Sequence, residues 1–191
     1  MRNSFISILM FMVILFMGCE QAEPKYIIGV SQCSEDIWRD WQNAEMRMEA
    51  NFHEGVELRF TAAHDDSELQ SNQIDSLVES GINLLIVAPN QLSTVSPAID
   101  RAYDKGIPVI VFERKTDSRK YSAFVSADNY EMGHLMGEYI ATQLGGKGQI
   151  MEVKGLKGSS PAEERYNGFH VALAAFPGIK VVDEIQGAWT E

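Results

Sequence analysis

The stretch that decides the fold is Ile107-Pro108-Val109-Ile110-Val111-Phe112-Glu113-Arg114. Its apolar part is almost continuous, which is typical of a strand that is covered on both faces of a parallel sheet. Glu113 and Arg114 follow at once, so the strand ends on a hydrogen-bond acceptor beside a fork of donors. Ligands of open parallel α/β sheets bind outside the carboxyl ends of the strands. The stretch therefore predicts a buried strand with a ligand site at its end.

Two other segments, Ser31–Trp38 and Gly158–Arg165, also carry polar or aromatic residues away from an apolar strand. The three segments together predict a small-molecule cleft suited to a polar ligand such as a sugar. Trp38 is expected to stack on that ligand, because its helical neighbours Gln42 and Glu45 are polar. The alternative is that Trp38 covers a loop or a domain interface.

Strand-like and helix-like stretches alternate along the chain from Tyr26 onward. We expect strands at Tyr26–Ser31, Val56–Thr61, Ile82–Ala88, Ile107–Phe112, Ala123–Ser126, Gln149–Lys154 and Ile179–Ile185. We expect helices at Asp36–His53, Ser67–Ser80, Ser96–Gly106, Tyr130–Leu144 and Ser160–Ala175. This alternation predicts a parallel sheet flanked by helices, with right-handed crossovers.

Two helices carry apolar residues at helical spacing, and we expect these residues to face inward. The first set is Ile37, Trp41, Ala44, Met48 and Phe52, and the second is Met132, Leu135, Met136, Tyr139 and Ile140.

The amino terminus predicts export. Arg2 precedes the apolar run Phe5–Met17, which suits the core of a signal peptide and is short for a membrane span. The run closes on Gly18-Cys19, so residues 1–19 are interpreted as a lipoprotein leader with Cys19 as the lipidation site, followed by a tether at residues 20–25. A plain signal peptide or an uncleaved anchor is the alternative.

Composition excludes several classes of function. The 191 residues carry a formal net charge of -11, which argues against a nucleic-acid partner. The four histidines are scattered, so neither a metal nor a cofactor is expected. Cys33 is interpreted as a packed structural residue, and Gly155–Ser160 as a glycine turn in which Ser160 caps a helix.

The carboxyl terminus lacks a closing helix, since the last expected strand is followed only by Gln186–Glu191. Two strands and one helix after Gly148 make a small core. We therefore expect a piece of a longer protein, with an incomplete first lobe at residues 26–128 and the start of a second at 129–191.

A set of local motifs is similar to the ribose-binding type of periplasmic sugar-binding protein, a group related to lactose-repressor-type effector domains. The motifs are Ile28–Ser31, Gln73 with Leu77 and Gly81-Ile82, Ala88–Asn90, Gly106–Arg114, Ala127–Asn129, and Gly158–Ala162 with Arg165 and Gly168-Phe169. The resemblance implies the type I periplasmic-binding-protein fold, in which two α/β lobes close on a monosaccharide, here truncated in the second lobe.

The resemblance also implies the ligand-binding residues, which are Glu35, Ile37, Trp38, Glu113, Arg114, Arg165 and Trp189. Trp38 and Trp189 would sandwich the sugar ring, Arg114 and Arg165 would donate hydrogen bonds, and Glu113 would accept. Glu113 stands where the family usually has aspartate, Ala88 where ribose binders often have asparagine, and Glu35 where an amide is usual. The identity of the sugar therefore stays open.

Within that family, Gly29–Ser34 with Trp38-Arg39, and Ser126–Asn129 with Gly187–Glu191, look like the periplasmic sensor segments of hybrid two-component histidine kinases. This implies a non-enzymatic sensor domain that is held at the membrane by a lipid or by a further segment, with a kinase dimer as its partner. The alternative is a substrate-binding lipoprotein that serves the permease of a sugar ABC importer. A Rossmann-type enzyme is a remote alternative, because no dinucleotide fingerprint or nucleophile elbow is present.

Overall fold

The computed structural model describes residues 26–187 and residue 189. The elements are β1 (Tyr26–Gln32), α2 (Ile37–Ala50), β2 (Val56–Ala62), α3 (Ser67–Glu79), β3 (Leu84–Val87), α4 (Ser96–Asp104), β4 (Val109–Phe112), β5 (Ala123–Val125), α5 (Asn129–Gln143), β6 (Lys147–Lys154), α6 (Ser160–Leu173) and β7 (Gly178–Gln186). Every helix and strand expected from the sequence is present, with ends that shift by a few residues. The predicted leader and its lipidation site lie outside the described residues.

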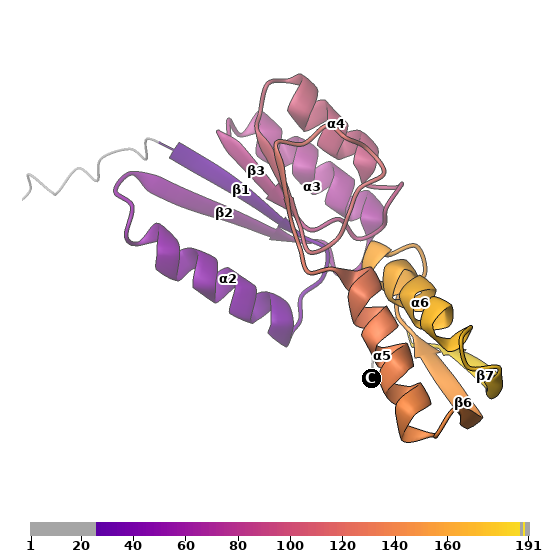
Figure 1. Cartoon of the computed structure of the whole chain (residues 1–191). Coiled ribbons are helices and arrows are strands. Elements are labelled where there is room, and N and C mark those ends of the chain that lie inside the picture. The colour runs from indigo at the N-terminus through magenta and orange to yellow at the C-terminus, as the bar shows by residue number, and fades with distance from the viewer. Residues whose placement is uncertain (1–25, 188, 190–191) are drawn as a thin grey trace, which may run out of the picture.

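The strands form two sheets, and every neighbouring pair is parallel. The first sheet has the order β2-β1-β3-β4-β5, and the second pairs β6 with β7 (Figure 1). We refer to β1–β5 with α2–α4 as the first unit, and to α5–β7 as the second unit. The predicted parallel α/β fold is confirmed.

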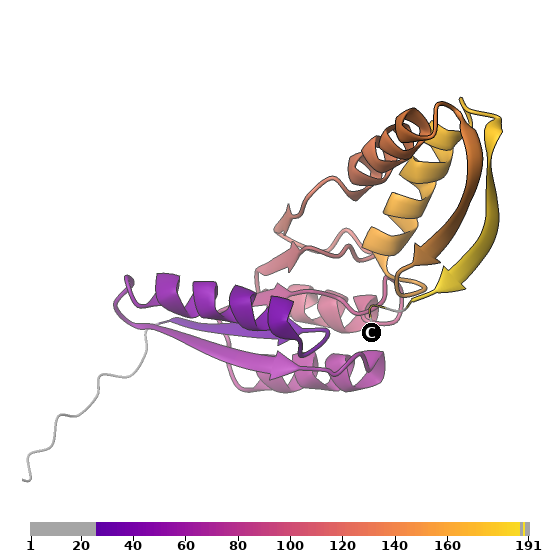
Figure 2. The ribbon, with the colours of Figure 1, turned by 90° about the horizontal axis from the view of Figure 1, so that it is seen from below.

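Helices cover the first sheet on both faces. α3 and α4 pack side by side on one face, and α2 lies on the opposite face (Figure 2). In the second unit, α5 and α6 pack closely together on the same side of the β6–β7 pair (Figure 2). This layering turns the carboxyl ends of β1, β3 and β4 toward the second unit.

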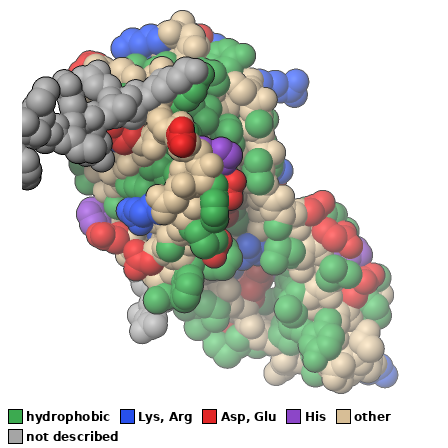
Figure 3. Space-filling model, turned by 90° about the vertical axis from the view of Figure 1, so that its left-hand side faces the viewer, with side chains coloured by type: hydrophobic (Ala, Val, Ile, Leu, Met, Phe, Trp, Pro, Cys, Tyr) green, Lys and Arg blue, Asp and Glu red, His purple; other side chains and the backbone are tan. Residues whose placement is uncertain are grey.

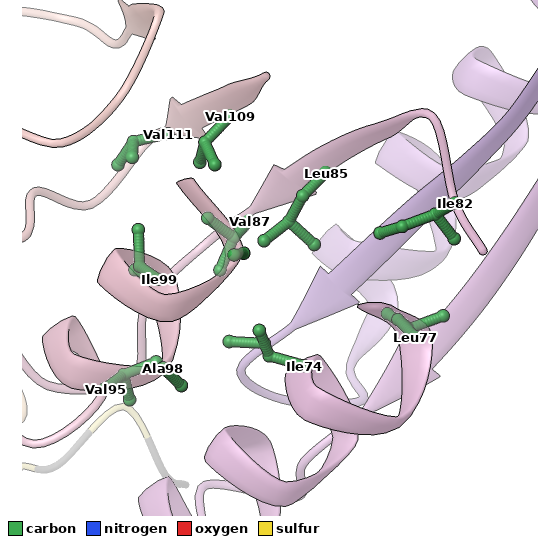
Figure 4. Packing of buried hydrophobic residues seen from close by; sticks show 11 residues of the cluster. Ile74, Leu77, Ile82, Leu85, Val87, Val95, Ala98, Ile99, Val109 and Val111 are labelled. Atoms are coloured by element: carbon green, nitrogen blue, oxygen red, sulfur yellow. The ribbon is translucent and has the colours of Figure 1, made fainter. Parts of the chain in front are cut away.

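The hydrophobic core lies between the first sheet and the α3–α4 layer. Alternate residues of β3 and β4, Leu85, Val87, Val109 and Val111, point into it and are fully buried (Figure 4). The two helices and the residue before α4 complete it with Ile74, Leu77, Val95, Ala98, Ile99 and Ala102. Val109 and Val111 are thus buried by the α3–α4 layer, while Ile110 and Phe112, on the other face of β4, are only half-buried.

The prediction for the inward face of α2 was wrong. Ile37, Trp41, Met48 and Phe52 are between 54% and 77% exposed, and the one fully buried side chain of this helix is Arg39. The helix turns a polar side to the sheet because its polar side chains find partners there. Arg39 contacts Cys33 and Glu113, and Asn43 accepts a hydrogen bond from Gln32. Figure 3, which looks at the side of the molecule where α2 lies, shows hydrophobic side chains at the surface.

The prediction for the inward face of α5 was also wrong. Met132, Leu135, Met136 and Tyr139 are exposed, and the buried residues of this helix include Gly133, Gly137 and Ala141. These small residues recur every four positions, which places them on one side of the helix. The helix α6 approaches on that side, so backbone packs against backbone and the large apolar side chains face outward.

No helix within the described ranges is long and apolar enough to cross a membrane.

Candidate functional site

The carboxyl ends of β1 and β3 are held together by one buried amide, that of Gln70 on α3. Its Nε2 donates to Ser31 Oγ at 3.2 Å and to the Ala88 carbonyl at 2.9 Å, and its Oε1 accepts from the Asn90 backbone N–H at 2.8 Å. All these groups are buried. Because each polar group has a partner, the strand ends form a rigid floor rather than a loose loop cluster.

Asn90 links this floor to the neighbouring loop and to the end of β4. Its Nδ2 donates to the Asp65 carbonyl at 2.7 Å and to Ser67 Oγ at 3.0 Å. Its backbone and side-chain oxygens accept from Arg114 Nη1 at 3.2 and 3.4 Å. Asn90 therefore fixes one edge of the Arg114 guanidinium.

The Nε atom of Arg114 is buried and has no acceptor among the described residues. The residue as a whole is 5% exposed. The nearest carboxylate oxygen, Glu113 Oε1, lies 3.9 Å from Nε. A buried donor without an acceptor carries a desolvation penalty, which a bound hydroxyl or carbonyl oxygen would remove.

Glu113 adopts a backbone conformation that is unusual for a residue with a side chain. Its φ is 61°, in the left-handed region, which costs about 1 kcal/mol or more outside glycine. The backbone is held there from both sides, since Glu113 N donates to Val125 O at 2.8 Å and Ser126 Oγ donates to the Glu113 carbonyl at 2.8 Å. The side-chain carboxylate makes an ion pair with Arg39.

The start of α2 carries three of the predicted ligand residues at the surface. Ile37 and Trp38 are exposed, and Glu35 faces His64 with Oε2 3.3 Å from Nδ1. Trp38 is 60% exposed, so its ring is free to contact a ligand. Trp41 and Met48 on the same helix are similarly exposed, so exposure alone does not identify Trp38 as a ligand contact.

The helix itself begins at an N-cap formed by Asp36, whose Oδ1 accepts from the Arg39 backbone N–H at 3.0 Å. Burial of Asp36 opposes ionisation, but the hydrogen bonds from Ser34 Oγ and the Arg39 N–H, with the Arg39 charge, outweigh it. Together they hold the pKa of Asp36 below its usual value.

The second unit brings the remaining two predicted residues together. Arg165 on α6 donates from Nε to Asn129 Oδ1 at 2.9 Å, and its guanidinium lies 5.9 Å from the centre of the Trp189 ring. The Trp189 ring lies against Gly155, where a Cβ atom would overlap it. Both side chains line a cavity of about 440 Å³ together with apolar residues of α5 and β6, such as Met132 and Val153.

The two units touch at the ends of their strands. Ser160 Oγ accepts from the Lys115 N–H at 2.6 Å, the Gly158 carbonyl accepts from Leu92 N at 3.0 Å, and Lys115 Nζ pairs with Glu164. The interpretation of Ser160 as a helix cap was wrong, because Ser159 holds the cap position and Ser160 serves this contact instead. The loop after Arg114 is thereby joined to the start of α6.

The predicted residues thus fall into three groups: Glu113 with Arg114, Arg165 with Trp189, and the exposed start of α2. The expected sandwich of a sugar ring between Trp38 and Trp189 stays a prediction. Sequence reasoning missed Arg39 and Gln70 as parts of the site. The signal for Gln70 was its position, four residues before the buried Ile74 on the inward side of α3.

Among the described residues, Glu152, His170 and Glu184 form a cluster that could hold a metal ion, with ligand atoms within 4.8 Å of one another. His170 Nε2 lies 2.8 Å from Glu152 Oε2. Glu184 already has a cationic partner, since a hydrogen bond from Lys154 lowers the pKa of Glu184. The ammonium supplies the positive charge that a metal would bring.

Known proteins resemble the chain over most of its length. Residues 28–191 match the family described as periplasmic binding protein domain. Among solved structures, the fructose-binding periplasmic domain of a hybrid two-component system superposes with a TM-score of 0.84 and 45% identity, over 86% of this chain and 55% of that one. A galactofuranose-binding protein superposes with a TM-score of 0.81 and 29% identity, over 86% and 57%.

Two curated relatives agree with these structures. The galactofuranose-binding protein of Escherichia coli is 30% identical over 168 residues, which are 85% of this chain and 52% of that protein. The ribose import binding protein of Bacillus subtilis is 30% identical over 116 residues, 61% of this chain and 38% of that protein. The chain thus spans about half or less of the length of these relatives. It belongs to the periplasmic binding protein family.

Proposed function

We propose that the chain forms an exported domain that binds a monosaccharide or a related small polar ligand between its two units, as the sensor segment of a two-component signalling protein. One observation carries the proposal: the buried Arg114 guanidinium keeps its Nε without an acceptor, beside the carboxylate of Glu113. A donor and an acceptor side by side match the hydroxyl groups of a sugar, each of which can both donate and accept.

The relatives support this ligand class. The structure with 45% identity is named for fructose, and other relatives are named for ribose and galactofuranose. Their names describe binding proteins, which supports a binding role rather than a catalytic one. We assign the ligand contacts to the predicted set, which is Glu35, Ile37, Trp38, Glu113, Arg114, Arg165 and Trp189.

The sensor role is favoured by the hybrid two-component relative. A substrate-binding lipoprotein of a sugar importer is the second candidate, and the sequence Phe16-Met17-Gly18-Cys19 together with the ribose import relative favours it. Both roles place the domain in the periplasm. They differ in the partner, which is a kinase dimer for the sensor and a permease for the importer.

Thermal-shift screening of the full-length natural protein tests the ligand class. The panel contains D-fructose, D-ribose, L-arabinose and D-galactose, with ATP as the unrelated polar ligand. We expect at least one sugar to raise the unfolding temperature in a saturable manner, because a ligand that binds only the native state stabilises it by mass action. Stabilisation by ATP with no response to any sugar would rule the proposal out.

Lipidation of Cys19 is tested by labelling cells with radioactive palmitate. We expect the label on the wild-type protein and its loss in Cys19→Ala, with Cys33→Ala as the matched control that keeps it. Label that persists in Cys19→Ala, or that is absent from the wild type, would show that Cys19 is not lipidated.

A further inference from the structure

Arg39 is a buried charged residue that none of the roles above has used. It is 2% exposed and follows directly after Trp38, but it points from α2 toward the sheet. Burial of a guanidinium is unfavourable unless hydrogen bonds and an opposite charge compensate for it. The contacts of Arg39 therefore indicate why the chain places an arginine there.

All three guanidinium nitrogens of Arg39 are engaged. Nε donates to Ser34 Oγ at 3.4 Å, Nη1 donates to Gln42 Oε1 at 2.8 Å, and Nη2 donates to Cys33 Sγ at 3.0 Å. Nη1 also forms an ion pair with Glu113 Oε2. Each guanidinium nitrogen of Arg39 thus has a partner within the protein, in contrast to Arg114, whose Nε donates to no described residue.

The carboxylate that Arg39 holds belongs to the residue with the left-handed backbone. Glu113 directly follows β4, and its φ of 61° departs from the extended backbone of the strand. Its Oε2 is buried and forms an ion pair with Arg39 without a hydrogen bond, while its Oε1 lies 3.9 Å from Arg114 Nε. Strained residues of this kind persist where the surrounding structure fixes them, and they concentrate at functional sites.

We propose that Arg39 is a positioning residue that fixes the Glu113 carboxylate and so sets the specificity of the ligand site. This inference rests on the proposed function, because it assigns Glu113 as the ligand's acceptor. Arg39 attracts one carboxylate oxygen of Glu113 in an ion pair, which leaves Oε1 to accept from the ligand. Arg114 then keeps its Nε for the ligand instead of closing on Glu113. A ligand must present a hydroxyl donor beside an acceptor to satisfy the pair.

A double-mutant cycle on the full-length natural protein tests the inference. Calorimetric titration uses whichever of D-fructose, D-ribose and L-arabinose stabilises the wild type most. We expect Arg39→Met and Glu113→Gln each to weaken binding at least tenfold. We expect the double variant to bind no more than about threefold more weakly than Glu113→Gln alone, because Arg39 acts through Glu113. A purely structural role of Arg39 would instead make the two losses multiply.

Two further variants keep the test decisive. Arg47→Met is the matched control. Arg47 lies two turns further along the same helix, and its guanidinium stacks 4.1 Å from the centre of the Phe60 ring. We expect the sugar affinity of this variant to stay within twofold of the wild type. Should Arg39→Met fail to fold, Arg39→Lys replaces it in the cycle, since lysine keeps the charge without the fork of donors. Wild-type affinity in the Arg39 variant, or multiplied losses in the double variant, would overturn the inference. Absence of any sugar binding by the wild type would instead overturn the proposed function.

Discussion

At the scale of single residues, the site depends on which of two arginines, Arg39 or Arg114, has all its guanidinium nitrogens paired within the protein. Arg114 is held along one edge by Asn90 and keeps Nε without an acceptor. Arg39 is satisfied on every nitrogen. The two guanidinium groups stand on either side of Glu113, so one orients the acceptor and the other completes the donor set.

Arg114→Ala should therefore weaken ligand binding strongly. Loss of a charged hydrogen-bond partner in a buried site costs about 2–4 kcal/mol of binding free energy. Calorimetry with the panel sugar that stabilises the full-length protein measures the loss. Arg119→Ala in the loop that follows is the matched control and should bind as the wild type does. Equal losses at the two positions would move the site away from the end of β4.

Asp36 should give the native state a dependence on acidic pH. Its pKa is lowered in the folded protein, so its stabilising contribution is complete above the unfolded value of about 4. The contribution is then lost as pH falls through the lower folded pKa. Asp36→Asn keeps an N-cap without a titrating group, and we expect it to flatten the loss of stability below about pH 4.

Asp36→Ala removes the cap as well as the charge. We expect it to lower the unfolding free energy by about 1 kcal/mol at pH 7. Chemical denaturation of the three proteins from pH 7 down to pH 3 separates the two effects. If Asp36→Asn kept the full acid dependence of the wild type, Asp36 would not be its source.

At the scale of helices and strands, α5 and α6 approach each other so closely that side chains are excluded. A Cβ atom on Gly137 would lie 2.7 Å from the Phe169 carbonyl oxygen and 2.8 Å from Ala172 Cβ. On Gly133 it would overlap the backbone of Arg165, and on Gly168 that of Tyr130. The contact matters for the site because Arg165 sits on this part of α6.

Gly133→Ala and Gly137→Ala should each destabilise the protein. Alanine favours a helix over glycine by about 1 kcal/mol, but overpacking against a neighbouring backbone costs about 1–3 kcal/mol, so the clash outweighs the propensity. Leu135→Ala on the exposed side is the control and should change stability by less than 0.5 kcal/mol, the order typical of surface positions. Urea denaturation provides the values. Stabilisation by either glycine substitution would mean that the helices separate easily.

The sequence was sufficient to predict where the helices and strands lie, but not which side of α2 and α5 is buried. Alternation of apolar runs, prolines at helix starts and glycines at helix ends predicted each helix and strand, because these signals are local. Which side of a helix is buried depends on what packs against it. On α2 the buried side follows Arg39 and its partners, and on α5 it follows Gly133 and Gly137, whose small size lets another backbone approach.

The candidate site was predictable to the same degree. Glu113 and Arg114 could be named because they directly follow an apolar strand, and the structure places them together. Arg39 could not be found in this way. Nothing in the local sequence indicates that a charged helix residue next to an exposed tryptophan is buried. Its role becomes visible only when Cys33, Ser34 and Glu113 come together from separate elements.

At the scale of the whole molecule, net charge and exposed apolar surface have opposite effects on association between copies of the chain. Large apolar side chains are exposed on α2, on α5 and on one face of β6, among them Trp41, Leu135, Tyr139 and Met151. Contiguous exposed apolar surface favours association. The net charge of -11 keeps copies apart through repulsion that salt screens.

A chain of residues 20–191, which leaves out the apolar run Phe5–Met17, should therefore associate as ionic strength rises. We expect light scattering to show a larger average mass in 0.5 M than in 0.05 M sodium chloride, because the Debye length falls from about 14 Å to about 4 Å. A dye that fluoresces on apolar surfaces should bind at both salt concentrations. Replacing Trp41 and Met48 with glutamate should reduce the association, while Glu45→Gln on the polar side should not. A monomer of unchanged mass that binds no dye would show that these side chains are covered in solution.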